Sequence, residues 1–385
     1  MVKTYQRIET RLIHAGTPQP RIQGAVVLPI FQSANFEYGG EGRYDDLKYI
    51  RLNNTPNHIA LHKLMSALEN APAALVAASG MAIIASSLLT VLGAGDHVLA
   101  QNCLYGGTHH LLTTDFPKLG IDCSFIDGDA PDSWAAALRP GTKAIYVEAM
   151  TNPLLEVADL PAVVRFAREH NLMSIIDSTF ASPINYRPIE AGFDLAVHSA
   201  TKYLNGHSDI VGGVAVGAAD TIERITHKMN HLGGSMDPHA AFLLYRGVKT
   251  LALRVRQQNQ SALAIARFLA AHPAVAQVNY AGLESHRRHQ RACELFAGFG
   301  GVLSFELKGS TERAEQFMHR CRIPIVAPSL GGLETLLTRP AITSHAGMSS
   351  QSRHGLGISD HLIRMSVGIE ASDELIEDFA QALEA

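Results

Sequence analysis

The chain has 385 residues, of which 46% are hydrophobic and 18% are charged, so it has enough apolar side chains for a large core and for two domains. This composition excludes a disordered or fibrous protein. The formal net charge is −4 and no block of basic residues is present, so we do not expect a nucleic-acid partner.

Two simple patterns indicate the cellular compartment of the protein and the role of its cysteines. The first sixteen residues, MVKTYQRIETRLIHAG, carry charges throughout and no apolar stretch, which is not the pattern of a secretory signal. Four cysteines lie far apart without a C-x-x-C pair (Cys103, Cys123, Cys293 and Cys321), which favours neither a disulfide framework nor a thiolate metal site. We therefore expect a cytoplasmic protein without a metal centre.

One uncharged stretch, residues 71–95, is about long enough to cross a bilayer. Polar residues interrupt it at Ser79-Gly80, Ser86-Ser87 and Thr90. A buried strand over 74–77, a turn and a buried helix up to Leu92 explain it better, so no membrane contact is expected.

Further along the chain, short apolar runs alternate with helical ones. The first fifty-odd residues show little periodicity and are interpreted as an extended arm, and helical spacing begins at residues 58–69. Buried strands are predicted at 97–101, 144–148, 173–177, 195–199 and 213–217, with a helix at 160–170. This alternation predicts an α/β fold with a mostly parallel sheet covered by helices on both faces.

The pattern changes after Asp237. A long helical stretch over 239–272 is followed by a strand at 301–307, a helix at 311–321, a strand at 362–370 and a terminal helix from Ser372. These elements are typical of a smaller α+β domain. The predicted organisation is an arm (1–57), an α/β domain (58–237) and a C-terminal α+β domain (238–385).

Nucleotide-binding fingerprints were considered first, because open α/β sheets bind ligands beyond the carboxyl ends of their strands. Gly298-Phe299-Gly300 lacks the third glycine, which Leu303 replaces, and it precedes a strand instead of following one. No Walker A sequence occurs. A nucleotide-binding oxidoreductase is therefore the weaker alternative.

The informative segment is DLAVHSATKYLNGHSDIVGG, residues 194–213. Lys202 follows an apolar strand and has Ser199 and Thr201 beside it, with a glycine-rich stretch after it. A lysine amine in apolar surroundings has a lowered pKa and can form a Schiff base, and the neighbouring hydroxyls can bind a phosphate. These are the requirements of pyridoxal phosphate (PLP), although a lysine extending from a strand end to solvent is an equally simple reading of this segment alone.

Two further segments support the PLP interpretation. Asp177 ends the predicted strand 173–177, where a carboxylate can bond the pyridine nitrogen and keep it protonated; a helix cap is the alternative. Ser79-Gly80-Met81 starts a helix after a strand, where free backbone N–H groups favour a phosphate.

These segments belong to a wider resemblance. The chain resembles the Cys/Met-metabolism family of PLP enzymes, which contains cystathionine γ-synthase, cystathionine β- and γ-lyases and methionine γ-lyase. The matching motifs cover nearly the whole chain in the right order: ASGM (78–81), LYGGT (104–108), E-x-x-x-NPLLEVADL (148–160), IIDSTFASP (175–183), SATKYLNGHSDIVGG (199–213), SLGGLET (329–335) and IRMSVGIE (363–370). The resemblance implies the PLP-dependent transferase fold, of aspartate aminotransferase type (fold type I).

The resemblance also implies roles for individual residues. Lys202 would be the Schiff-base lysine and the proton carrier, Asp177 would pair with the ring nitrogen, and Tyr105 would stack on the ring and assist proton transfer. The implied phosphate and ring contacts are Ser79, Gly80, Met81, Asn152, Thr179, Ser199 and Thr201, and the implied contacts with the substrate carboxylate are Ser329 and Arg364. Tyr49 and Arg51 would reach the phosphate site of a neighbouring subunit, which implies a homodimer as the catalytic unit and commonly a tetramer.

Three positions depart from common family patterns. Asn54-Thr55-Pro56 replaces the usual Asn-Pro-Thr, so the start of the first helix can differ. Pro328 precedes the SLGG motif, as in plant-type γ-synthases, and Gly107 stands where methionine γ-lyases carry a cysteine. We expect a transsulfuration-type enzyme acting on an amino-acid substrate, most readily a cystathionine lyase, with γ-replacement as the close alternative and a non-catalytic PLP protein as a remote one.

Overall fold

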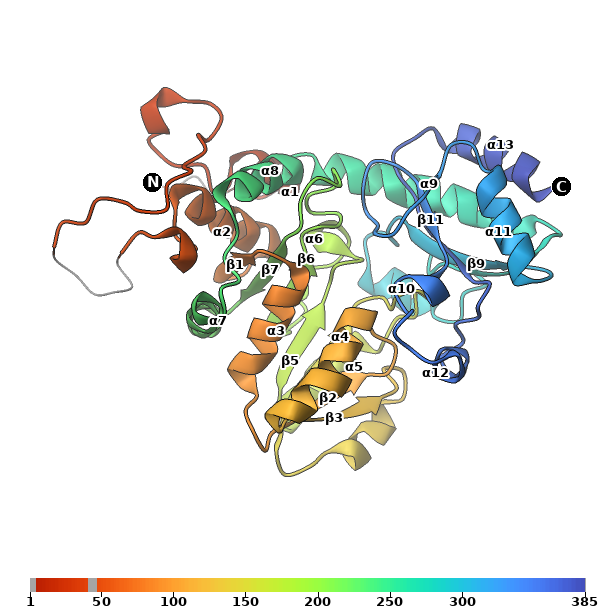
Figure 1. Ribbon diagram of the computed structural model, residues 1–385, viewed down its shortest axis with the longest axis horizontal. Helices are drawn as coiled ribbons and strands as arrows, with labels where there is room; N and C mark the ends of the chain where they lie inside the picture. Colours follow the sequence, from red (N-terminus) through yellow and green to blue (C-terminus); the bar gives the residue numbers. More distant parts are fainter. Residues whose placement is uncertain (1–4, 41–46, 385) are drawn as a thin grey trace.

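The computed structural model describes residues 5–40 and 47–384. The predicted arm, 1–57, therefore includes two stretches, 1–4 and 41–46, that lie outside the described residues. The chain forms two sheets with separate hydrophobic cores, and the described ends of the chain lie on opposite sides of the molecule (Figure 1).

The helices and strands have the following bounds. The strands are β1 (Ala73–Ala77), β2 (His97–Gln101), β3 (Asp122–Ile126), β4 (Thr142–Glu148), β5 (Met173–Asp177), β6 (Leu195–Ser199), β7 (Gly213–Gly217), β8 (Val275–Asn279), β9 (Val302–Leu307), β10 (Ile325–Val326), β11 (Leu336–Thr338) and β12 (Ile363–Ser366). The α-helices are α1 (Ile8–His14), α2 (Pro56–Glu69), α3 (Gly80–Val91), α4 (Gly106–His110), α5 (Leu160–Glu169), α6 (Ser182–Asn185), α7 (Ala219–Leu232), α8 (Pro238–Val248), α9 (Leu251–Ala271), α10 (His289–Leu295), α11 (Thr311–Arg320), α12 (Ser350–Gly355) and α13 (Ser372–Leu383).

The larger sheet has the strand order β1-β7-β6-β5-β4-β2-β3. The five strands from β6 to β3 are parallel, and only β7 runs antiparallel to both of its neighbours. Its strands alternate between two buried clusters, one packed under α2, α5 and α8 and the other under α3 and α7. The predicted α/β fold with a mostly parallel sheet and helices on both faces is confirmed.

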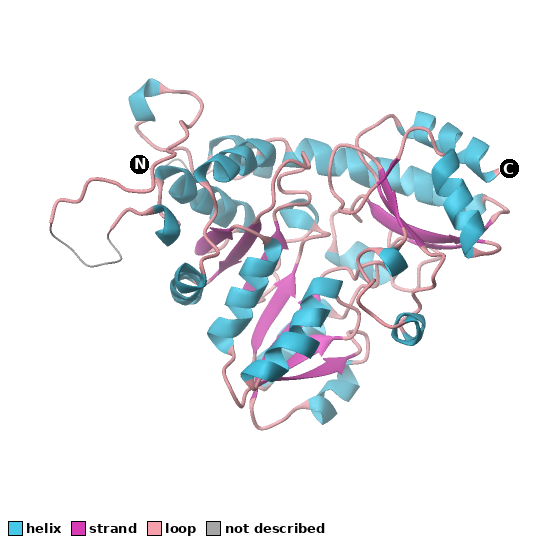
Figure 2. Ribbon diagram, viewed as in Figure 1, coloured by secondary structure: helices cyan, strands magenta, loops and turns pink. Residues whose placement is uncertain are grey.

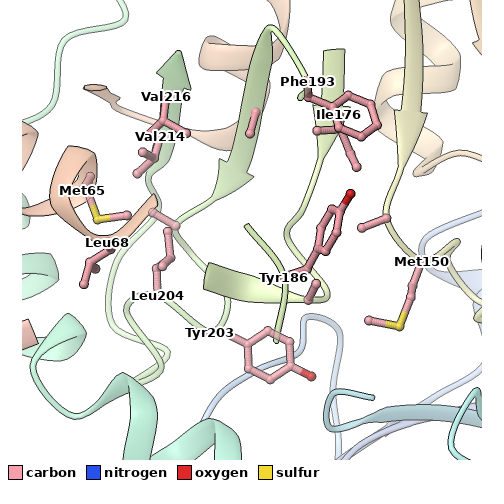
Figure 3. Close-up of a cluster of buried hydrophobic side chains, with 14 of the residues drawn as sticks. Met65, Leu68, Met150, Ile176, Tyr186, Phe193, Tyr203, Leu204, Val214 and Val216 are labelled. Atoms are coloured by element: carbon pink, nitrogen blue, oxygen red, sulfur yellow. The ribbon is translucent and has the colours of Figure 1, made fainter. Parts of the chain in front are cut away.

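The first of these clusters holds the sheet to its helices. Met65 and Leu68 of α2 pack with Val214 and Val216 of β7, as Figure 3 shows. Each of these side chains is almost fully buried, and burying one such side chain contributes about 1.5–3 kcal/mol. This packing holds α2 against β7, the neighbour of β6 in the sheet.

The smaller sheet has the order β10-β11-β12-β9-β8 and is antiparallel except for the pair β10–β11. Helices α9, α11 and α13 pack on it, and the two sheets are distinct in Figure 2. The expected α+β character of the C-terminal part agrees with this arrangement.

Helix α9 connects the two cores. Val255 in its first half packs in the cluster of the larger sheet, whereas Ile265 and Leu269 pack in the cluster of the smaller one. Helix α8 also packs with the larger sheet. We therefore propose that the junction between the domains lies within α9, whereas the sequence-based boundary before residue 238 stays a prediction.

Two elements differ from their predicted extents. The helical stretch 239–272 breaks between α8 and α9, where the buried Arg254 side chain donates to the carbonyl oxygen of Gly247 and to Thr250 Oγ1. The strand predicted at 362–370 leaves the sheet after Ser366, because Gly368 runs so close to another loop that a Cβ there would lie 2.1 Å from the Leu333 carbonyl oxygen. Within the described residues, every helix is too short or too polar to span a bilayer.

Candidate active site

A cavity of about 630 Å³ lies at the carboxyl ends of β4, β5 and β6, where the smaller domain contributes its segments around residues 329, 344 and 364. Every predicted site residue lines this cavity except Tyr49 and Arg51: Ser79, Gly80, Met81, Tyr105, Asn152, Asp177, Thr179, Ser199, Thr201, Lys202, Ser329 and Arg364. Residues separated by up to 285 positions in the sequence thus share one site.

Lys202 lies in the turn that follows β6. Its Nζ donates a hydrogen bond to Ser329 Oγ at 2.7 Å. Burial, and then the nearby charge of Arg364, lower the pKa of Lys202 to about 8. At pH 7 a lysine with this pKa is neutral in about a tenth of the molecules, far more than an ordinary lysine, so it can act both as a nucleophile and as a base.

The turn that carries Lys202 is held from α9. Arg254 is 4% exposed, and its guanidinium donates to the carbonyl oxygens of Tyr203 at 2.8 Å and Leu204 at 3.3 Å. These two carbonyls directly follow Lys202. The buried arginine therefore fixes the backbone from which the reactive amine projects.

Asp177 ends β5 and is buried. Burial raises its pKa, and the backbone N–H and hydroxyl of Thr179 oppose that rise by donating to the carboxylate. The N–H bond to Asp177 Oδ1 measures 2.9 Å. An anionic carboxylate in this position can bond a protonated ring nitrogen.

The start of α3 forms a cradle for an anion. Ser79 caps the helix, since its Oγ accepts from the backbone N–H of Ala82 at 3.0 Å. A Cβ on Gly80 would lie 2.9 Å from the Cβ of Ser199, so only glycine allows the helix to start this close to β6. Free N–H groups, the positive end of the helix dipole and the nearby hydroxyls suit a phosphate.

Arg364 of β12 also lines the cavity and is 4% exposed. Its Nη1 donates to Asn152 Oδ1 at 3.1 Å and its Nη2 donates to the Ser329 carbonyl at 2.8 Å. Ser329 has a φ of +82°, a left-handed conformation that is costly for serine and typical of functional sites. A buried guanidinium held in this way can bind a carboxylate with two hydrogen bonds.

Tyr105 stands at the start of α4, and 42% of it is exposed to the cavity and solvent. Its backbone N–H donates to Glu148 Oε1 at 2.6 Å. Glu148 was assigned no role from the sequence although it lies in the site. The signal was present, because Glu148 ends a buried apolar strand in the same way as Asp177 does.

Tyr49 and Arg51 lie outside the cavity. Arg51 donates to the carbonyl of Asn230 at 3.1 Å, and its guanidinium carbon lies 5.6 Å from the centre of the Tyr49 ring.

Pro56 occupies the first turn of α2. The altered order Asn54-Thr55-Pro56 therefore still starts the helix, because proline is well tolerated at this position.

Known proteins resemble the chain over almost its entire length. Residues 9–384 match the family described as "Cys/Met metabolism PLP-dependent enzyme". The chain belongs to this family. It is 40% identical to a cystathionine γ-lyase from Bacillus subtilis (98% of this chain, 99% of the relative). It is 42% identical to a probable cystathionine γ-synthase from Herpetosiphon aurantiacus over a shorter region (82% of this chain, 98% of the relative).

A solved structure agrees with the family assignment. The cystathionine γ-lyase from Lactobacillus plantarum, crystallised with L-serine, superimposes with a TM-score of 0.94 at 36% identity and covers 98% of this chain and 99% of its own. The chain therefore has the fold of type I PLP enzymes and uses PLP. The cavity fits this cofactor, because the anion cradle, the buried carboxylate and the partly neutral lysine surround one space.

Proposed function

We propose that the protein is a PLP-dependent cystathionine lyase, which breaks a C–S bond to give a thiol, ammonia and a 2-oxo acid. The observation that carries the proposal is the hydrogen bond between Lys202 Nζ and Ser329 Oγ. It places a base of lowered pKa next to the serine whose carbonyl oxygen holds Arg364. An amino acid whose carboxylate binds Arg364 would therefore present its Cα to Lys202.

The substrate would be oriented by its carboxylate. The guanidinium of Arg364 is already fixed by Asn152 and Ser329, so little side-chain entropy is lost when a carboxylate binds. Its Nε has no hydrogen-bond partner among the described residues. That buried donor is available to a ligand, and leaving it unsatisfied costs about 1–3 kcal/mol.

The phosphate of PLP would lie at the start of α3 with Gly80, Met81, Ser199 and Thr201, and its ring nitrogen would face Asp177. When bound, the cofactor supplies the electron sink for a carbanion at Cα. Lys202 would remove the Cα proton, and a β-leaving thiolate could then depart. A γ-leaving group requires a second proton to be taken from Cβ, and the same amine would have to take it.

Replacement at Cγ is the second candidate function, because the chain is 42% identical to a probable cystathionine γ-synthase and Pro328 lines the cavity next to Ser329. Steady-state assays with cystathionine, cysteine, methionine and O-acylhomoserines separate the outcomes. A lyase releases pyruvate or 2-oxobutyrate from cystathionine. Formation of a new thioether from an O-acylhomoserine, with no oxo acid from cystathionine, would reject the lyase proposal.

We also propose that the catalytic unit is a homodimer, commonly assembled into a tetramer, and that the protein acts in the cytoplasm. The placement of Arg51 supports the first part, since this residue lies outside the cavity of its own chain. Exposed apolar side chains on the arm, Val26 at 77% and Val27 at 62%, are consistent with a partner surface.

A further inference from the structure

His345 is a buried titratable residue to which the proposed reaction gives no part. It is 1% exposed and lies in the segment between β11 and α12 of the smaller domain. Burial lowers its pKa to about 4, and the nearby charge of Arg364 acts in the same direction. The imidazole is therefore neutral under ordinary conditions, with one nitrogen that donates and one that accepts.

One nitrogen of the His345 ring lacks a hydrogen-bond partner among the described residues. Ser344 Oγ lies 2.9 Å from Nδ1, and a hydroxyl there can donate to the imidazole. Nε2 then carries the hydrogen, yet it is buried and has no hydrogen bond of ordinary geometry among the described residues. The backbone carbonyls of Leu104 and Asn152 favour the protonated form of the ring, so both lie close enough to act on it, although neither makes a hydrogen bond of ordinary geometry with Nε2 among the described residues.

Those two carbonyls belong to the loops that build the site. Leu104 precedes Tyr105, and Asn152 holds Arg364 through its side chain. On the opposite side, Glu148 accepts from the N–H of Tyr105, and the N–H of Asn152 also lowers the pKa of Glu148. The same two loops thus have an acceptor from the larger domain at their N–H groups and the imidazole of the smaller domain near their carbonyls.

The segment around His345 is in tight contact with the Tyr105 loop. A Cβ on Gly106 would lie 2.1 Å from the carbonyl oxygen of Ser344, so the two backbones meet without room for a side chain. Thr343 and Ser344 line the cavity directly. A change in the position of this segment would therefore be transmitted to Tyr105.

We propose that His345 is a positioning residue for substrate binding: as a neutral donor it ties the smaller domain to the loops of Tyr105 and Asn152 and so sets the distance between Tyr105 and Arg364. His345 touches neither substrate nor cofactor in this proposal. It deepens the proposed function, since it concerns the same site, but it applies to any amino-acid substrate held by Arg364.

Two matched variants of the holoenzyme test the proposal. His345→Gln keeps an N–H donor near the place of Nε2, whereas His345→Met fills similar space without one. We expect His345→Met to raise KM for L-cystathionine about tenfold, as for a buried donor or acceptor left unsatisfied, with a smaller change in kcat. His345→Gln should stay within about threefold of wild type, because a donor is retained.

Binding without turnover provides the second readout. The Kd of L-alanine, followed by the visible absorbance of the bound cofactor, should rise in parallel with KM, while the Kd of PLP and the Tm change little. His354→Met is the matched control, because His354 is exposed on α12. If His345→Met leaves KM and the Kd of L-alanine at wild-type values, or if the Gln and Met variants are equally impaired, the proposal is wrong.

A third variant covers the case in which His345→Met does not fold. Gly106→Ala would force the Ser344 carbonyl away from the Tyr105 loop, and it should raise the Kd of L-alanine about tenfold as well. A wild-type value in that variant would overturn the proposal. The alanine titration also separates this inference from the proposed function, since a wild-type enzyme that binds L-alanine but does not cleave cystathionine contradicts only the lyase assignment.

Discussion

Glu148 and Asp177 are register partners at the carboxyl ends of the parallel strands β4 and β5. Both are buried, and burial raises the pKa of each. The charge of Asp177 raises the pKa of Glu148 further, whereas Thr179 and Tyr146 stabilise the anionic form of Asp177. Two adjacent buried carboxylates rarely ionise together, so the negative charge is favoured on Asp177, and the pKa of Glu148 is the one raised further by its neighbour.

The first prediction follows from that assignment. Glu148→Gln keeps the shape of the side chain and its acceptor without a charge, so kcat and KM should change less than about threefold, because a hydrogen bond to the Tyr105 N–H is retained. Glu148→Ala removes the acceptor and should raise KM about tenfold. Steady-state kinetics with a Tm measurement for each variant tests this, and a Gln variant as impaired as the Ala variant would show that Glu148 acts as an anion.

Asp177→Asn should act on the chemical step. The amide preserves the shape of the side chain but cannot stabilise a positive charge on the ring nitrogen, so kcat should fall about 10- to 100-fold, as for loss of a charged hydrogen bond. KM should change less, because Arg364 and not Asp177 would bind the carboxylate of the substrate. An Asn variant as fast as wild type would mean that Asp177 only orders Thr179.

The lowered pKa of Lys202 predicts how the apoenzyme takes up its cofactor. Only the neutral amine can attack the aldehyde of PLP, and with a pKa of about 8 the neutral fraction rises as the pH rises through 8. The rate of covalent incorporation, followed by visible absorbance, should therefore increase from pH 6 to 9 and level off above. An ordinary lysine would still be gaining rate at pH 10.

Lys202→Ala is the control for that experiment. It should bind PLP without covalent attachment and should lose turnover by about two to four orders of magnitude, as expected for loss of a general acid–base group. A pH profile of incorporation with its midpoint above 10 would contradict the lowered pKa.

Arg364→Lys tests the carboxylate site. Lysine keeps the charge but loses the planar fork that Asn152 and Ser329 fix, so KM for any α-amino acid should rise about tenfold or more. The loss in kcat should be smaller, because the contact exists in the ground state as well as in the transition state. An unchanged KM for all substrates would place the carboxylate elsewhere.

Apolar strands and the residues at their ends were the features most accessible to sequence analysis. The strands β2, β5, β6 and β7 have the predicted bounds, since each is a continuous buried apolar run between turn residues. β3 was not predicted, because only Ile126 of its five residues is buried. β8 was missed for a similar reason, with two of its residues exposed.

The site residues also divide into those that carry a local sequence signal and those that do not. Asp177 and Lys202 were found because each follows an apolar strand, and Arg364 came only from the family resemblance. The approach of Ser344 to Gly106 carried no local signal, because it joins segments more than 230 positions apart in the sequence. Contacts between distant loops depend on the packing of the two domains, which periodicity does not encode.

The last prediction concerns Arg51, which bonds the carbonyl of Asn230 and lies near Tyr49, away from the cavity of its own chain. If it serves the phosphate of a neighbouring subunit, Arg51→Ala should lower the affinity for PLP about tenfold, as for one charged hydrogen bond. Mixing Arg51→Ala chains with Lys202→Ala chains gives the decisive test. In a hybrid dimer with shared sites, one site carries both defects and the other carries neither. Random pairing should therefore restore roughly a quarter of the wild-type sites. Activity is measured at a PLP concentration well below the Kd of the Arg51→Ala variant, so that neither parent has appreciable activity. Differential tags confirm that hybrids have formed, and hybrids as inactive as both parents would show that Arg51 acts within its own chain.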